Sequence, residues 1–192
     1  IIVVEDTPKY YSTILPVLYK EIIFNTKQLI DKSLNNTQKL FHMRGRPKII
    51  LTTNYEDAIL IFKKHQKNTL GIITDLRFPI KNIKNPNAGI NLISDIRKLD
   101  SSIPILLQTT HSINNKYIKK FSVKYINKNS PKLFKELKEF MVHNFGFGVF
   151  EFRLPNGKII GKAADLKQLR KKLSLINEKS IIFHASNNHL SN

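Results

Sequence analysis

Short runs of consecutive apolar residues recur along roughly two thirds of the chain, and polar side chains follow each run. The runs lie at residues 1–4, 48–52, 70–73, 103–110 and 123–128. Uninterrupted apolar runs of this length are typical of strands that are covered on both faces, as in parallel sheets. The pattern therefore predicts five buried strands.

Between these runs, apolar residues recur at the three- and four-residue spacing of helices. Helices are expected from residue 8 to about 41, around 58–62, around 90–96, at 114–121 and from 131 to about 141. Strands that alternate with helices in this way are typical of α/β proteins. The sequence predicts a doubly wound, five-stranded parallel sheet.

Local signals refine these elements. Pro16 lies inside the first helical pattern and predicts a kink or a break near Leu15. Thr53 and Glu56 have the spacing of a capping box at the start of the second helix. Residues 42–47 and 80–88 are expected to be loops, and the second of them to be irregular because it is rich in Lys, Asn and Pro.

The last 50 residues or so differ in character. Pro155, Asn156 and Gly157 predict a hairpin turn, and Asp165 and Gln168 have capping-box spacing before a further helix. Residues 180–183 are expected to form a strand. We therefore expect two domains, a sheet domain at 1–142 and a small α+β appendage at 143–192. They would be joined by a hinge at 145–148, and more protein is expected after residue 192.

Composition sets limits on function. The 192 residues are 41% hydrophobic and contain no cysteine, which excludes disulfides, thiolate metal sites and a cysteine nucleophile and fits a cytoplasmic, reducing compartment. No apolar run reaches the length of a membrane span. The formal net charge of +18 would ordinarily suggest nucleic acid, but the excess is mostly Lys spread over most helices. We do not expect a dedicated nucleic-acid role.

The polar groups that follow the apolar runs form the candidate site. They are Glu5, Asp6, Asp75, Thr109 and Lys128. In parallel sheets these positions share one edge, where ligands bind. Three carboxylates need a cation among them, and an oxygen-only ligand set suits Mg²⁺. With a lysine and a hydroxyl added, the set could neutralise a phosphoryl group.

These residues resemble the receiver domain of two-component response regulators. That family has an acidic pair after the first strand, Asp-x-x-x-Pro after the third, a Gly leading the next helix, a hydroxyl after the fourth strand, and an aromatic and a Lys at the fifth. The matching residues are Glu5, Asp6, Asp75, Pro79, Gly89, Thr109, Tyr125 and Lys128. The resemblance covers about residues 1–142 and implies a flavodoxin-like strand order of 2-1-3-4-5.

The resemblance also implies roles for these residues in a bacterial phosphorelay. Asp75 would accept a phosphoryl group from the phosphohistidine of a sensor histidine kinase or a phosphotransfer protein. Mg²⁺ would lie on Asp6, Asp75 and the backbone carbonyl of Arg77, with Glu5 nearby. Thr109 and Lys128 would hold the phosphoryl oxygens, and Tyr125 would change rotamer as Thr109 moves.

The sequence departs from the family pattern at several points. Asn129 follows Lys128 where the family usually has Pro, and Thr110 stands where a smaller residue is common. The long first helix and the 80–88 insertion could form a partner or dimer surface, or be tolerated additions. The alternative interpretation is a pseudo-receiver, an interaction domain of a larger enzyme that is not phosphorylated.

A second, shorter resemblance concerns residues 128–131, 144–148 and 153–157. These segments resemble the N-terminal region of bacterial proteins that carry a phosphoenolpyruvate synthase-like or pyruvate, phosphate dikinase-like module downstream. If so, the chain would be a regulatory region and the catalytic module would lie outside it.

Overall fold

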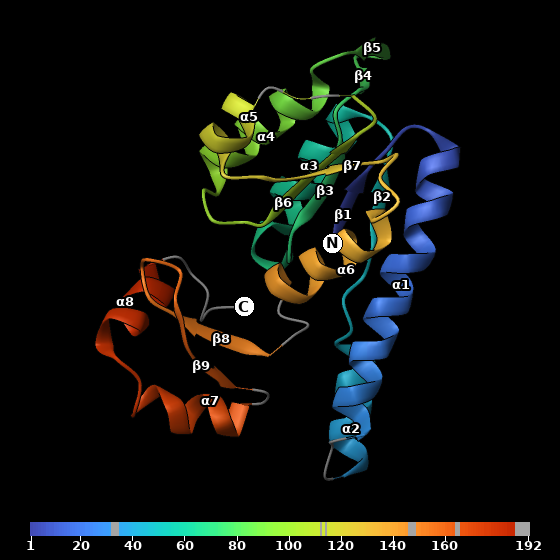
Figure 1. Cartoon of the computed structure of the whole chain (residues 1–192). Coiled ribbons are helices and arrows are strands. Elements are labelled where there is room, and N and C mark those ends of the chain that lie inside the picture. The colour runs from blue at the N-terminus through green and yellow to red at the C-terminus, as the bar shows by residue number, and fades with distance from the viewer. Residues whose placement is uncertain (32–34, 112, 114, 146–148, 164–165, 187–192) are drawn as a thin grey trace. The chain divides into compact units, whose positions relative to one another are not determined.

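The computed structural model describes residues 1–31, 35–111, 113, 115–145, 149–163 and 166–186. The chain divides into two compact units, Ile1–Phe140 and Met141–Asn192 (Figure 1). The domain boundary expected from the sequence, after residue 142, lies two residues beyond this division.

A five-stranded parallel sheet forms the centre of the first unit. Its strand order is β2-β1-β3-β6-β7, which confirms the doubly wound, flavodoxin-like 2-1-3-4-5 arrangement. The strands are β1 (Ile2–Val4), β2 (Ile50–Thr52), β3 (Ile72–Asp75), β6 (Ile105–Thr109) and β7 (Lys124–Asn127). Because all five run in one direction, their carboxyl ends lie at one edge.

Helices cover both faces of this sheet (Figure 1). They are α1 (Pro8–Asp31), α2 (Asn36–Arg44), α3 (Tyr55–His65), α4 (Ala88–Leu99), α5 (Asn115–Phe121) and α6 (Leu133–Asn144), with a 3₁₀ turn at Gln66–Asn68. One core joins Val4, Ile72 and Leu107 to Phe62 of α3 and Leu92 of α4. The alternate strand residues are also buried and face the other side, because successive side chains of a strand point to opposite faces.

The second face belongs to α1 and α6. On α1 the buried positions Ile14, Leu18 and Ile22 recur every four residues and form one apolar stripe. Lys138 of α6 lies 3.1 Å from Glu21 of α1, so the two helices are neighbours.

The sequence predicted a kink or a break near Leu15; α1 continues through Pro16, so the break is absent. Pro16 removes the hydrogen bond to the carbonyl of Ser12, but both residues are exposed, so water can take the place of the missing N–H. The buried stripe on either side, at Ile14 and Leu18, holds the helix together. The expected loop at 42–47 was also wrong in part, because α2 continues to Arg44.

The second correction concerns the start of α3. The side chain of Asn54, not Thr53, caps this helix: its Oδ1 accepts a hydrogen bond from the backbone N–H of Asp57 at 2.8 Å. Its Nδ2 donates to Asp57 Oδ2 at 2.8 Å. The cap therefore lies one residue after the predicted Thr53, and its second hydrogen bond joins two side chains, whereas in a capping box it would return to the backbone N–H of the cap residue.

Residues 78–85 form a β-hairpin where an irregular loop was predicted. Strand β4 (Phe78–Ile80) pairs antiparallel with β5 (Ile83–Asn85). Lys81 and Asn82, with φ of 51° and 63°, make the turn, and two positive φ values are the signature of a type I′ hairpin. Lysine rarely adopts this conformation, which is why the sequence did not reveal the turn.

The second unit is a hairpin with two helices. Strands β8 (Phe150–Arg153) and β9 (Ile159–Ala163) pair antiparallel around Gly157, and α7 (Leu166–Leu173) and α8 (Glu178–Ser186) follow. The strand expected at 180–183 is wrong, because Asn177 Oδ1 accepts the N–H of Lys179 at 2.9 Å and starts a helix there. The expected cap at Asp165 and most of the 145–148 hinge fall outside the described residues.

None of the helices in the described ranges is long and apolar enough to cross a membrane.

Candidate functional site

Asp75 is the last residue of β3 and lies almost covered at the carboxyl edge of the sheet, with 7% of its surface exposed. Its Oδ2 accepts the backbone N–H of Arg77 at 3.3 Å. Gly89, at the start of α4, packs against its backbone: a Cβ on Gly89 would lie 2.2 Å from the Asp75 carbonyl oxygen. The beginning of α4 thus fixes the end of β3.

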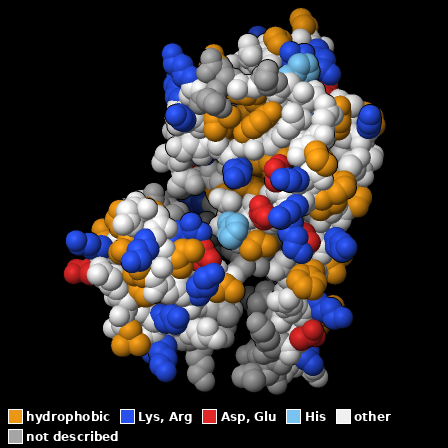
Figure 2. All heavy atoms as spheres, in the orientation of Figure 1, with side chains coloured by type: hydrophobic (Ala, Val, Ile, Leu, Met, Phe, Trp, Pro, Cys, Tyr) orange, Lys and Arg blue, Asp and Glu red, His pale blue; other side chains and the backbone are white. Residues whose placement is uncertain are grey.

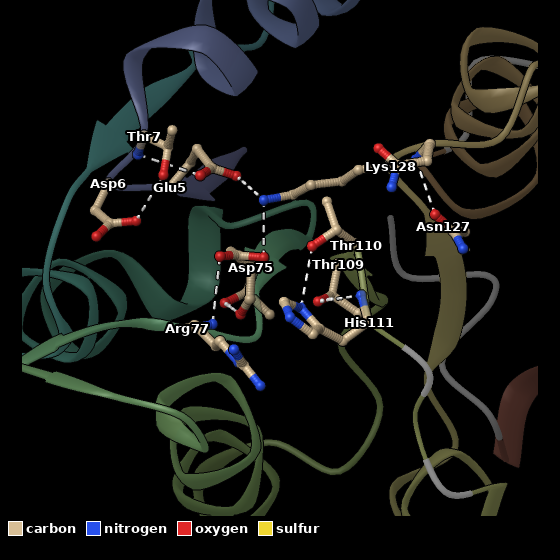
Figure 3. A network of polar contacts seen from close by, with 12 residues as sticks. Glu5, Asp6, Thr7, Asp75, Arg77, Thr109, Thr110, His111, Asn127 and Lys128 are labelled. Atoms are coloured by element: carbon tan, nitrogen blue, oxygen red, sulfur yellow. Dashed lines mark hydrogen bonds and ion pairs between the residues drawn. The ribbon is translucent and has the colours of Figure 1, made fainter.

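Glu5 and Asp6 follow β1, the neighbouring strand. Carboxylate oxygens of Glu5, Asp6 and Asp75 all lie within 4.8 Å of one another. Thr7 orients both acids, because its N–H donates to Glu5 Oε1 at 3.2 Å and its hydroxyl donates to Asp6 Oδ1 at 3.2 Å. The structure therefore brings together the three carboxylates that the sequence placed at separate strand ends (Figure 3).

Lys128 bridges two of these acids. Its Nζ lies 2.5 Å from Glu5 Oε2 and 2.8 Å from Asp75 Oδ1 (Figure 3). The ammonium also lies 4.2 Å from the centre of the Tyr10 ring, a cation–π distance. Its backbone N–H donates to the carbonyl of Thr109 at 2.9 Å, which ties the residue to the end of β6.

Burial makes this a strongly coupled site. The side chains of Glu5 and Lys128 are 0% and 2% exposed, so water screens their interaction very little. Burial raises the pKa of Glu5, while the ammonium of Lys128 acts in the opposite direction by stabilising the carboxylate. One buried cation faces two carboxylates, which leaves negative charge that a further cation can neutralise.

A second cation reaches the site from the β4–β5 hairpin. Lys84 Nζ lies 3.1 Å from Asp6 Oδ2, and the two side chains are 62% and 15% exposed. The sequence did not single out Lys84, because only the hairpin pairing directs it toward Asp6. Of the two lysines at the site, the exposed Lys84 is easier for a metal ion to displace than the buried Lys128.

Thr109 and Tyr125 meet at the backbone of His111. The hydroxyl of Thr109 accepts the N–H of His111 at 3.3 Å, and the hydroxyl of Tyr125 donates to the carbonyl of His111 at 3.2 Å. Thr109 is buried at the end of β6, next to the site. The backbone N–H of Arg77 donates to Asp75. The expected role of the Arg77 carbonyl as a Mg²⁺ ligand stays a prediction.

Gln108 is a buried polar residue that the sequence interpretation passed over. It pairs in register with Asp75 across β3 and β6, so both side chains leave the same face of the sheet. It is 0% exposed, and its two amide atoms have no hydrogen-bond partner among the described residues. A Gln inside an otherwise apolar run was the available signal.

The residues present fit a magnesium ion. The donor set is three carboxylates without nitrogen or sulfur, which is the chemistry Mg²⁺ prefers. The side chains of Asp6 and Asp75 keep 15% and 10% of their surface exposed, which leaves access for the waters that Mg²⁺ retains. Asp6 and Asp75 would be its main ligands.

The class that fold and site define is a doubly wound α/β domain with an acidic pocket at the carboxyl edge of its sheet. No protein-family model matches the chain, and no curated protein matches it. Among solved structures it is similar to the crystal structure of the phosphorylated cyanobacterial phytochrome response regulator RcpA. The two are 15% identical with a TM-score of 0.44, over 83% of this chain and 96% of that one. The fold assignment rests on the strand order and registers above.

Proposed function

We propose that this chain carries a response-regulator receiver domain that accepts a phosphoryl group on Asp75. The observation that supports the proposal most is the position of Lys128, whose ammonium lies 2.8 Å from Asp75 in a pocket that also holds Glu5 and Asp6. A nucleophilic carboxylate, a fixed positive charge and an oxygen-only cation site are the parts that phosphoryl transfer requires.

The donor would be the phosphohistidine of a sensor kinase or a phosphotransfer protein. A carboxylate oxygen of Asp75 attacks phosphorus, the P–O bond forms as the P–N bond breaks, and the imidazole nitrogen keeps the electron pair and takes a proton from solvent. Lys128 neutralises the negative charge that gathers on the phosphoryl oxygens. Mg²⁺, held by Asp6 and Asp75 with Glu5 nearby, would supply further positive charge there.

Transfer to Asp75 would be read out through Thr109 and Tyr125. A phosphoryl oxygen on Asp75 would accept a hydrogen bond from the Thr109 hydroxyl, and moving that hydroxyl toward Asp75 would stretch the bond it now accepts from the N–H of His111. The carbonyl of the same His111 accepts the Tyr125 hydroxyl. Movement of Thr109 toward the phosphoryl group would therefore disturb the hydrogen bond that holds Tyr125, and so change the surface around it.

The second candidate is a pseudo-receiver that binds partners without phosphorylation. Two observations favour it: Asp75 is only 7% exposed, and Lys84 already lies on Asp6. In that case the buried ion pairs would be structural. A catalytic module downstream, implied by the shorter sequence resemblance, gains no support from the comparisons and stays a prediction.

Beryllofluoride separates the two candidates, because it binds receiver aspartates as a phosphoryl analogue only with a divalent ion present. We expect ¹⁹F NMR of the whole chain with Mg²⁺ to show a protein-bound beryllofluoride signal that Asp75→Asn abolishes. Asp31→Asn, at an exposed position of α1, is the matched control and should retain the beryllofluoride signal. A wild-type chain that binds neither Mg²⁺ nor beryllofluoride would leave the pseudo-receiver as the function.

A further inference from the structure

Helix α1 extends well beyond the sheet that it covers. Its 24 residues span about 36 Å at 1.5 Å per residue. The longest strand has five residues and spans about 17 Å. Consistently, the buried residues of α1 end at Ile22, and none of the described side chains from Ile23 to Asp31 is buried. The far part of α1 therefore overhangs, with α2 packed beside it (Figure 1).

The overhanging part of α1 and the neighbouring α2 enclose an apolar groove of about 380 Å³. Its apolar lining comes from both helices: Ile23 and Ile30 from α1, and Leu40 and Met43 from α2. Ile23, Leu40 and Met43 are 54%, 53% and 54% exposed, although aliphatic side chains of this size are usually covered. A concave apolar surface of this kind is typical of a binding site.

The charged side chains that line the groove are all basic, and the exposed carboxylate of Asp31 follows Ile30 at its margin. Thr26, Lys27, Arg44 and Arg46 complete its lining, which includes no carboxylate among the described residues. Figure 2 shows Lys and Arg side chains, with some acidic ones, between apolar side chains along the edge of the molecule where α1 lies. A second copy of this chain, with its net charge of +18, would meet this surface with like charge.

We propose that the α1–α2 groove binds an acidic amphipathic helix of a partner protein. Apolar side chains at i, i+3/i+4 and i+7 of that helix would enter the groove between Ile23 and Leu40, and Glu or Asp on its flanks would pair with Lys27, Arg44 and Arg46. The groove lies between two helices that pack side by side, so its shape suits a rod-like ligand. This function is separate from phosphoryl acceptance and does not depend on it.

A designed peptide tests the proposal on the whole chain. The probe is a fluorescein-labelled peptide of about 18 residues, long enough to form a helix, with Leu along one face, Glu on both flanks of that face and Ala elsewhere. A second peptide keeps every Glu and replaces each Leu with Ser. Fluorescence anisotropy at about 0.15 M salt should show that the Leu peptide binds at least tenfold more tightly than the Ser peptide.

Matched double variants locate the binding. Leu40→Ser with Arg44→Glu alters the α2 wall. Leu60→Ser with Lys64→Glu makes the same change with the same i,i+4 spacing at exposed positions of α3. The α2 variant should weaken binding of the Leu peptide at least tenfold, and the α3 variant less than twofold. If the α2 variant loses helicity by circular dichroism, Ile23→Ser with Lys27→Glu tests the α1 wall in its place.

Several results would overturn the proposal. Equal losses in the groove and control variants would show general attraction to a basic protein. Equal binding of the two peptides would remove the role of the apolar lining. Groove-dependent binding to phosphatidylglycerol vesicles or duplex DNA without binding of the Leu peptide would identify another class of ligand. Self-association that is abolished by the α2 variant would make the occupant a second copy.

Discussion

The α-carbon of Gly89 lies against the backbone carbonyl of Asp75, so closely that a Cβ would stand 2.2 Å from the oxygen and 3.0 Å from the Cα of Leu76. These neighbours are backbone atoms, which cannot rotate away as a side chain can. Gly89 N–H also donates to the carbonyl of Leu76 at 3.0 Å. One residue of α4 thus sets the position of the proposed phosphoacceptor.

Gly89→Ala should therefore damage both the fold and the site. Overpacking of this kind costs about 1–3 kcal/mol, and the shift it forces falls on Asp75. We expect a lower free energy of unfolding in urea and weaker Mg²⁺ binding by calorimetry. Asn91→Ala, at an exposed position of the same helix, should change neither. Unchanged stability in Gly89→Ala would mean that the contact relaxes without cost.

Removal of the buried cation should be costly. Lys128→Met leaves Glu5 buried without its partner, and breaking a buried ion pair costs about 3–5 kcal/mol. Denaturation in urea near pH 7 should show a loss of this order. Adding Glu5→Gln removes the uncompensated charge and should recover part of it. Two single losses that simply add in the double variant would show that the residues are not coupled.

Lys84 should compete with the divalent ion for Asp6. Its ion pair is exposed, and such pairs contribute about 0.2–1 kcal/mol. Lys84→Gln should therefore raise the Mg²⁺ affinity about 1.5- to 5-fold by calorimetry. Lys81→Gln removes a charge from the same hairpin, where Lys81 uses only its backbone N–H to bind Glu56. If both variants gained Mg²⁺ affinity equally, the cause would be the lower net charge of the protein and not the loss of the Lys84–Asp6 ion pair.

The hydrogen bond between Tyr55 of α3 and Asp95 of α4 predicts a pH dependence of stability. Hydrogen bonds from Lys98 and then Tyr55 lower the pKa of Asp95 below its usual value. A lowered pKa means that the stabilisation is present above about pH 4 and is lost as pH falls through the folded-state pKa. Tyr55→Phe should cost about 1 kcal/mol near pH 7, since Asp95 is partly exposed.

This cost should shrink as the pH falls from about 4 through the lowered folded-state pKa of Asp95, because Asp95 then loses its charge in wild type as well as in the variant. Urea unfolding at a series of pH values measures it. Tyr117→Phe, at a tyrosine that is 43% exposed on α5, is the control and should cost little at any pH. A difference between wild type and Tyr55→Phe that stays constant down to pH 3 would contradict this account.

The sheet could be predicted from the sequence because five apolar runs and the helical periods between them agree with one architecture. The acids at the ends of the first and third strands followed from the same pattern, since parallel strands share an edge. Only the structure shows that carboxylate oxygens of Glu5, Asp6 and Asp75 lie within 4.8 Å of one another. The strand order that produces it was implied only by the family resemblance.

The features that the sequence analysis missed depend on backbone conformations and strand pairings that residue types do not predict. Lys81 and Asn82 adopt positive φ, and the resulting hairpin brings Lys84 to Asp6. The short, mostly apolar segment at 180–183 suits a strand or a helix equally. Asn177, three residues earlier, caps the helix that forms there. Gln108, a polar residue within the apolar run of β6, was visible in the sequence, but only the pairing of β6 with β3 places it beside Asp75.

The most direct test of the central claim is the intact mass of the chain after incubation with Mg²⁺ and acetyl phosphate. We expect the mass to increase by one phosphoryl group, and this increase should require Mg²⁺ and be absent in Asp75→Asn. Brief treatment with hydroxylamine should remove the group, as it removes an acyl phosphate. An unmodified wild-type chain, or a phosphoryl group that persists in Asp75→Asn, would contradict the claim.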